Sequence, residues 1–297
     1  MPSQKIVVPD DSLKALFLET YYANNLDEQH FISTGTGFYY KSPTAGAVFL
    51  VTARHVVTAR AWRDGHFIGR EPNGLRVHGH IRADDGSAVM YDAETKSIVD
   101  AYYDVPLFDL DSEGAEIPRW LEHPDLGKDF DVVALPVTPP SEFHCAPYQQ
   151  ADDYDLSLTD ELFIVGYPYG LRGHILPIWV RGTIASLPGL GYDGFPLFLI
   201  DSRTRQGQSG APVIRYLKEG TIVGHPMAPM GQTATIVDGD LSKLVGVYTG
   251  RVNRTKTQLP PHEVEELRRG STDLGLVWWV PELERLCTSG VKPSGVI

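Results

Sequence analysis

RQGQSGAPVI, residues 205–214, places a serine between two glycines and directly before a short apolar run. Glycine adopts backbone angles that other residues avoid, so Gly207 and Gly210 allow the chain to turn sharply on either side of Ser209. The apolar residues that follow are typical of a β-strand. A serine on such a turn is a candidate nucleophile, provided that a base lies close enough to take its proton.

Two earlier stretches supply residues for that role. LVTARHVV ends an apolar run with His55, and DFDVVALPV places Asp131 directly before another. A neutral imidazole accepts a proton near pH 7, and a buried carboxylate holds the ring in the required tautomer and stabilises its charged form. The order His55, Asp131, Ser209 therefore predicts a catalytic triad. We expect the backbone amides of Gly207 and Ser209 to donate hydrogen bonds to a developing oxyanion.

The composition is that of a globular chain with an acidic balance. Asp and Glu number 38 against 26 Lys and Arg, which gives a net charge of −12. A phosphate backbone would repel this surplus, so we expect no nucleic-acid partner. No uninterrupted apolar stretch of about 18 residues occurs, and the first residues lack a basic segment followed by a long apolar one. We therefore expect no membrane association and a cytoplasmic location.

The chain contains only two cysteines, Cys145 and Cys287, which lie far apart in the sequence. A disulfide framework is excluded by this count, and we interpret both as free thiols. His78 and His80 point to one face of an expected strand and form half of a metal site, but no third ligand stands at a fixed spacing. We therefore expect no metal and no other cofactor.

Runs of β-branched and aromatic residues separated by Gly, Pro and Asp predict a mainly β fold. The 29 glycines and 22 prolines fit many short strands. The apolar spacing in DDSLKALFLETYY predicts a helix, and further short helices are expected for HEVEELRR and for PELERLCT, which begins at Pro281. Five segments are expected: an N-terminal helical extension (1–27), a first β-barrel carrying His55 and Asp131 (28–137), a linker (138–158), a second β-barrel carrying Ser209 (159–281), and a C-terminal helix with a tail (282–297).

The three motifs resemble those of the trypsin-like serine peptidases. TARHVV, DVVAL and GQSGAP are similar to the histidine, aspartate and serine motifs of that family, and GTGFYY is similar to a strand of its bacterial HtrA-like branch. The resemblance covers roughly residues 30–287, and we expect no PDZ domain after it. It implies two antiparallel six-stranded β-barrels of the chymotrypsin fold, with the site in the cleft between them. It also implies a serine endopeptidase that acts on protein or peptide substrates through an acyl-enzyme.

The same resemblance bears on specificity. Gln208 stands where trypsins have the aspartate that pairs with a freed N-terminus, so no zymogen switch of that kind is expected. Arg203 stands where trypsin has its cation-binding aspartate, which argues against cleavage after Lys or Arg. Arg203 and Thr204 are candidate donors to an acidic substrate side chain, although Tyr248 stands where Glu-specific relatives have a histidine. We expect the peptide to lie extended along the residues Tyr248, Thr249 and Gly250.

Other interpretations use different residues. Asp129 is an alternative orienting acid, and Cys145, which follows His144, is an alternative nucleophile without a glycine turn. An esterase of the α/β-hydrolase fold would need His225 or His262 as its base, after Ser209 in the sequence. That fold also requires alternating strands and long helices, which the sequence does not indicate.

A protein of a different functional class could have the same fold without catalysing a reaction. A catalytically silent or partner-activated trypsin-like binding module would have the same sequence pattern, and a regulatory protein partner fits a peptidase that must be restrained. Residues 62–128 and 216–243 are interpreted as insertions that shape access to the site.

Overall fold

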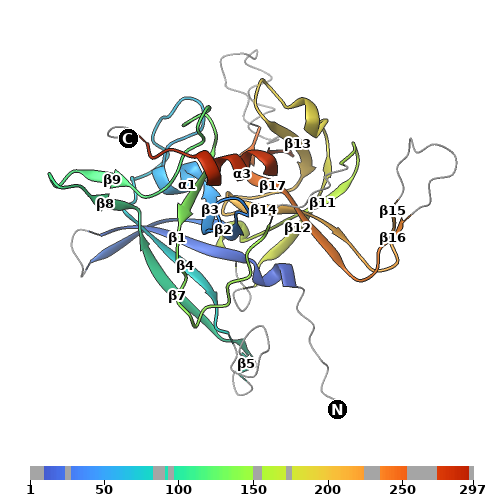
Figure 1. Ribbon diagram of the computed structural model, residues 1–297, viewed down its shortest axis with the longest axis horizontal. Helices are drawn as coiled ribbons and strands as arrows, with labels where there is room; N and C mark the ends of the chain where they lie inside the picture. Colours follow the sequence, from blue (N-terminus) through green and yellow to red (C-terminus); the bar gives the residue numbers. More distant parts are fainter. Residues whose placement is uncertain are drawn as a thin grey trace.

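The chain forms two β units that lie side by side (Figure 1). The computed structural model describes residues 10–23, 28–82, 91–92, 97–149, 156–171, 176–223, 235–252 and 273–293. The first unit is a six-stranded antiparallel sheet, and the second is a closed six-stranded antiparallel barrel. The predicted all-β fold of two six-stranded antiparallel units is therefore confirmed. The first unit differs from the prediction in being an open sheet, because its edge strands are not paired with each other in the described residues.

The first sheet has the strand order β10-β3-β2-β1-β4-β7. Its strands are β1 (Ala15–Ala23), β2 (Gln29–Lys41), β3 (Val48–Ala53), β4 (Gly74–His80), β7 (Asp100–Pro106) and β10 (Val132–Pro136). Strands β4 and β7 lie within residues 62–128, so the interpretation of this whole stretch as an insertion is wrong. The acidic residues of this stretch hide the strand pattern in the sequence. Within β7, Val105 is buried, whereas the alternate positions, which include Asp100 and Asp104, are exposed.

The predicted N-terminal helix is also wrong. Residues 10–13 form one 3-10 turn, η1 (Asp10–Leu13), and strand β1 follows. Successive side chains of β1 pack into different clusters: Ala15 and Phe17 in one, Leu16 and Leu18 in another. This alternation is typical of a strand whose two faces are both buried. The two edges of β1 pair with β2 and β4. Tertiary pairing thus overrides a spacing that also fits a helix.

The barrel has the order β11-β12-β13-β18-β17-β14 and closes on itself. Its strands are β11 (Glu161–Gly166), β12 (Ile178–Ile184), β13 (Leu197–Ser202), β14 (Ala211–Leu217), β17 (Leu241–Arg251) and β18 (Leu274–Trp279). The first-sheet strands end at Pro136 and the barrel strands begin at Glu161. The division of the chain at residues 138–158 remains a prediction.

Short elements connect these strands. They are α1 (Arg54–Thr58), β5 (Tyr91–Asp92), β6 (Ser97–Ile98), β8 (Phe108–Leu110), β9 (Glu116–Pro118), η2 (Pro168–Gly170), η3 (Pro188–Leu190), β15 (Ile222–Val223), β16 (Thr235–Ile236) and α3 (Val280–Ser289). Helix α3 confirms the helix predicted from Pro281, whereas the one predicted for residues 262–269 lies outside the described residues. None of the described helices is long and apolar enough to cross a membrane.

One apolar cluster joins the two units. Phe130, from the segment before β10, stacks edge-on against Trp278 of β18 with ring centroids 4.7 Å apart. Helix α3 lies across the junction (Figure 1) and contacts β10, β17 and β18. The carboxylate of Glu284 in α3 accepts hydrogen bonds from the hydroxyls of Tyr40 and Ser42 in the first unit. These contacts hold the ends of β10 and β18, which border the candidate site, in one packed core.

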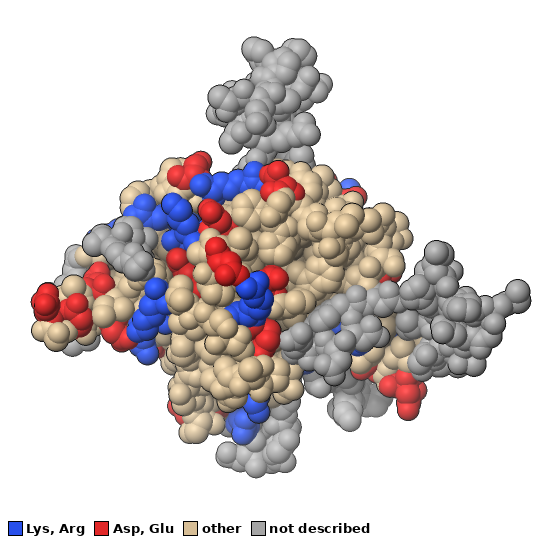
Figure 2. Space-filling model, turned by 45° about the horizontal axis from the view of Figure 1, so that its top comes forward, with Lys and Arg blue, Asp and Glu red and all other residues tan. Residues whose placement is uncertain are grey.

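The view in Figure 2 shows acidic and basic side chains interspersed over this face of the molecule. No extended basic area is visible on the described surface in this view.

Candidate active site

Strand pairing brings His55 and Asp131 together. His55 is the second residue of α1, directly after β3, and Asp131 directly precedes β10. Strands β3 and β10 are antiparallel neighbours with Ala53 opposite Val132. The end of one strand therefore meets the start of the other, and the Arg54 amide donates to the Asp131 carbonyl at 3.1 Å. Side chains 76 positions apart in the sequence become neighbours through this register.

The Asp131 carboxylate contacts both the ring and the backbone of His55. Nδ1 of His55 lies 2.9 Å from Oδ2 and 3.2 Å from Oδ1, and the His55 amide donates to Oδ1 at 3.1 Å. An ionised carboxylate only accepts hydrogen bonds, so the proton of the neutral ring resides on Nδ1 and Nε2 remains available as a base. Asp131 is 4% exposed, which shields this contact from water.

The pKa of His55 is raised above its ordinary value. Burial disfavours the charged ring, but the charge of Asp131 and the hydrogen bond to it outweigh burial and favour the imidazolium.

This shift predicts the acid side of the pH–rate profile. A general base must be neutral, so a raised pKa means that kcat/KM for a neutral peptide falls to half its plateau at a pH above 6.5. The measurement is kcat/KM across the pH range with one uncharged substrate. A half-maximal point at or below pH 6.5 would contradict the ion pair described above.

Asp129, the alternative acid, is exposed. Its backbone carbonyl accepts a hydrogen bond from the indole of Trp62 at 2.8 Å, and no described contact joins its side chain to His55. The geometry therefore favours Asp131 as the partner of the imidazole.

The segment before Ser209 forms a hydrogen-bonded turn. The Gln208 amide donates to the Arg205 carbonyl at 3.3 Å, and Gly207, at the third position, has φ +92°. A type II turn requires a positive φ at this position, which explains the glycine. The buried side chain of Gln208 accepts a hydrogen bond from the Arg205 amide at 2.8 Å. Gln208 thus closes the turn with its side chain.

Two backbone amides at this turn, those of Gly207 and Ser209, differ from their neighbours in their hydrogen bonding. The Gln206 carbonyl accepts a hydrogen bond from the Tyr169 amide at 2.6 Å. The N–H of the same trans peptide group, that of Gly207, points the opposite way. Within the part of the chain that the structure describes, neither this N–H nor that of Ser209 has a hydrogen-bond partner. These are the two amides expected at the oxyanion site.

Thr36 of β2 fixes the position of the turn. Its hydroxyl donates to the Gly207 carbonyl at 2.8 Å and accepts from the Tyr167 amide at 3.2 Å. Its own amide donates to the Ser209 carbonyl at 2.9 Å. Gly210 fits against the first sheet only as glycine, because a Cβ there would lie 2.1 Å from the Thr36 carbonyl oxygen. Thr36 therefore couples the nucleophile turn to the sheet that carries His55.

The hydroxyl of Ser209 donates to the Thr249 carbonyl at 3.2 Å. No hydrogen bond joins Ser209 to His55 in this conformation of the described residues. The Thr249 hydroxyl in turn accepts from the indole of Trp278 at 3.1 Å. Catalytic hydrogen bonds often tighten only with substrate bound.

The expected specificity residues separate into two groups. Thr204, Tyr248 and Thr249 are buried beside the nucleophile turn, and Gly250 is half-buried. Arg203 is exposed. Sequence reasoning assigned no site role to Thr36, Tyr169 and Trp278, because each acts on the site through strand pairing or packing. Thr36 lies within GTGFYY, but that motif does not reveal its contacts with the serine turn.

The other candidate residues lie elsewhere. Burial raises the pKa of the Cys145 thiol, which opposes formation of the nucleophilic thiolate. The Nε2 atom of His78 lies 2.7 Å from Glu19, and both ring nitrogens of His80 lack partners in the described residues. The α/β-hydrolase interpretation is excluded because the strands of both units are antiparallel. Its required bases, His225 and His262, lie outside the described residues.

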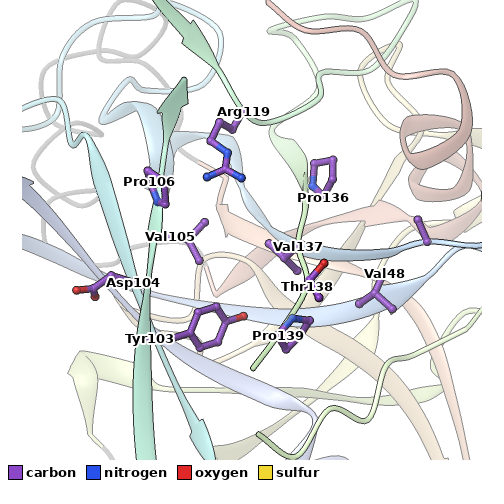
Figure 3. A pocket seen from close by; sticks show the side chains of 11 residues that line it. Val48, Tyr103, Asp104, Val105, Pro106, Arg119, Pro136, Val137, Thr138 and Pro139 are labelled. Carbon is purple, nitrogen blue, oxygen red and sulfur yellow. The ribbon is translucent and has the colours of Figure 1, made fainter. Parts of the chain in front are cut away.

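A cavity of about 670 Å³ lies away from this site, at the open side of the first sheet. Figure 3 shows Tyr103 and Val105 of β7 on one side of it and the residues after β10, such as Val137 and Pro139, on the other. None of His55, Asp131 and Ser209 lines it.

A two-unit antiparallel β fold with a histidine–aspartate pair beside a serine turn defines the chymotrypsin-like class. The family model described as trypsin-like peptidase domain matches residues 35–225. The chain therefore belongs to the trypsin-like peptidase family. No curated protein matches the sequence.

Among solved structures, the chain is similar to the Rv3671c protease from M. tuberculosis in its active form, with 15% sequence identity. The match covers 96% of this chain and 85% of the other, with a TM-score of 0.44.

Proposed function

We propose that the protein is a serine endopeptidase that hydrolyses peptide bonds through an acyl-enzyme. The observation that carries this proposal is the pairing of His55 Nδ1 with the buried Asp131 carboxylate, next to a turn where the Gly207 and Ser209 amides have no partner among the described residues. Family membership supports the same reaction class. The triad roles of His55, Asp131 and Ser209 remain part of the proposal.

The proposed reaction has two halves. Ser209 Oγ forms a bond to the scissile carbonyl carbon while His55 Nε2 takes its proton, and the Gly207 and Ser209 amides bind the resulting oxyanion. The carbon–nitrogen bond then breaks, and the leaving amine takes the proton from His55. Water repeats these steps on the ester and releases the acid. Asp131 stabilises the imidazolium in both halves.

The proposed substrate is an extended peptide segment of a protein. Strand β14 pairs with β17 only as far as Tyr248, so the backbone of Thr249 and Gly250 beyond it is not paired with β14. An extended peptide on this edge would place a carbonyl beside Ser209. We also propose that the protein acts on a protein substrate in the cytoplasm. The proposed reaction involves no nucleic acid, membrane or cofactor.

A partner-activated module is the second candidate. It is favoured by the hydrogen bond from Ser209 to Thr249, which turns the hydroxyl toward the Thr249 carbonyl. On this alternative a regulatory protein would shift the hydroxyl toward His55.

An activated ester tests the proposed chemistry directly. Incubation with p-nitrophenyl acetate is expected to give a burst of p-nitrophenol and one acetyl group on the peptide that contains Ser209, detected by mass spectrometry. The matched control is Ser141→Ala, which removes an exposed serine and should retain the burst. Acetylation at another residue, or no burst from wild type, would contradict the proposal.

A further inference from the structure

A hydroxyl group of the first unit is inserted between two segments of the barrel. Thr36 belongs to β2 and is 0% exposed. Its Oγ1 atom donates to the Gly207 carbonyl at 2.8 Å and accepts from the Tyr167 amide at 3.2 Å. Gly166 ends β11 at this point, and a Cβ there would lie 2.9 Å from Oγ1. The absence of a side chain at Gly166 therefore makes room for the Thr36 hydroxyl.

Thr36 holds both of the residues whose amides are expected at the oxyanion site. Its hydroxyl binds the carbonyl of Gly207, and its backbone amide donates to the carbonyl of Ser209 at 2.9 Å. The carbonyl of Thr36 is itself fixed, since it accepts a hydrogen bond from the hydroxyl of Thr52 in β3 at 2.8 Å. Two residues of the turn are thus positioned by one residue of the neighbouring unit.

The turn needs this support because its glycine can adopt other backbone angles. Gly207 has φ +92°, as a type II turn requires. A type I turn differs in the orientation of its central peptide group, here the one between Gln206 and Gly207, and would turn the Gly207 amide away from its present direction. The Tyr169 amide, which donates to the Gln206 carbonyl at 2.6 Å, opposes that change on one side of Gly207. The Thr36 hydroxyl opposes it on the other side.

We propose that Thr36 is a positioning residue whose buried hydroxyl keeps the Gly207 amide directed at the oxyanion. This inference rests on the proposed peptidase function. It makes the oxyanion site depend on contact between the two units, because the hydroxyl belongs to the first unit and the amides lie between strands β13 and β14 of the barrel. Loss of the hydroxyl should act on the transition state, where negative charge develops on the substrate oxygen, and much less on substrate binding.

Thr36→Val tests the proposal, because valine has nearly the same shape and lacks the hydroxyl. It should lower kcat by about 30-fold, which is less than the loss of an oxyanion donor, and should change KM by less than about threefold. Affinity for a peptide boronic acid, whose tetrahedral adduct on Ser209 places an oxygen at the oxyanion site, should fall by about the same factor as kcat. The acid side of the pH–rate profile should not move, because no described contact joins the Thr36 hydroxyl to His55.

Three further variants complete the test. Thr36→Ser keeps the hydroxyl and should restore kcat to within about threefold of wild type. Thr36→Ala removes it without placing a methyl group against the Gly207 carbonyl, and it tests the proposal if Thr36→Val does not fold. Thr20→Val is the matched control, because it removes another buried hydroxyl of the first sheet, 2.8 Å from the hydroxyl of Ser33. It should lower stability and leave kcat within about twofold of wild type.

Active sites are counted by complete labelling with a fluorophosphonate, a probe that captures activated serines, so that kcat refers to folded enzyme alone. Folded Thr36→Val or Thr36→Ala with kcat and boronic acid affinity within about threefold of wild type would overturn the positioning role and leave the proposed function standing. A loss of kcat without a loss of affinity, or with a shifted acid side of the pH–rate profile, would also overturn it. Wild type that neither reacts with the probe nor cleaves a peptide would overturn the proposed function and this inference with it.

Discussion

Ser209→Ala is expected to lower kcat for peptide hydrolysis by about 100,000-fold, because it removes the atom that forms the acyl-enzyme. His55→Ala should cost about as much, since without the base the hydroxyl keeps its proton. The double variant should be no slower than either single one, because the two residues act as a unit. The measurement is kcat with one peptide substrate and large amounts of each variant.

The folded state should survive the serine substitution. Among the described residues, the Ser209 hydroxyl makes one hydrogen bond, to the Thr249 carbonyl at 3.2 Å, and a single neutral hydrogen bond contributes about 1 kcal/mol. Circular dichroism and thermal unfolding of Ser209→Ala should therefore match wild type closely. A folded Ser209→Ala that retains kcat within about tenfold of wild type would overturn the nucleophile assignment.

The second large effect is expected for Asp131→Asn, which should reduce kcat/KM by about 10,000-fold near neutral pH. The side-chain amide introduced by this substitution would donate to Nδ1 of His55 instead of accepting from it. The ring would then carry its proton on Nε2, where it cannot accept one from Ser209. The charge that favours the imidazolium would also be lost. The measurement is kcat/KM at several pH values with an uncharged peptide.

Asp129→Asn provides the matched control, because Asp129 is two residues away and exposed, and has no recorded contact between its side chain and His55. Its effect on kcat/KM should be less than about twofold. A large loss in Asp129→Asn together with a small one in Asp131→Asn would show that the orienting acid has been misassigned.

Local motifs predicted those parts of the fold and of the site that depend on residues close together in the sequence. The glycines around Ser209 match a turn with positive φ at Gly207 and Gly210, and the apolar runs match strands β3, β10 and β14. His55 follows β3 and Asp131 precedes β10. Because these strands are antiparallel neighbours, the end of one lies beside the start of the other, which brings the two residues together.

Features that depend on distant pairing were not predictable in the same way. The segment that forms β1 has a spacing that also fits a helix. Its edges pair with β2 and β4, and its two faces pack into two different apolar clusters, so its structure is set by residues far away in the sequence. Arg203 has the expected position in sequence, but its side chain is exposed.

Fluorophosphonate labelling of wild type and Ser209→Ala, side by side, tests the central claim most directly. The account predicts covalent labelling of wild type at Ser209 and none of the variant, because only a serine with an activating base reacts with the probe. Equal labelling of both proteins, or labelling of wild type at another serine, would contradict it.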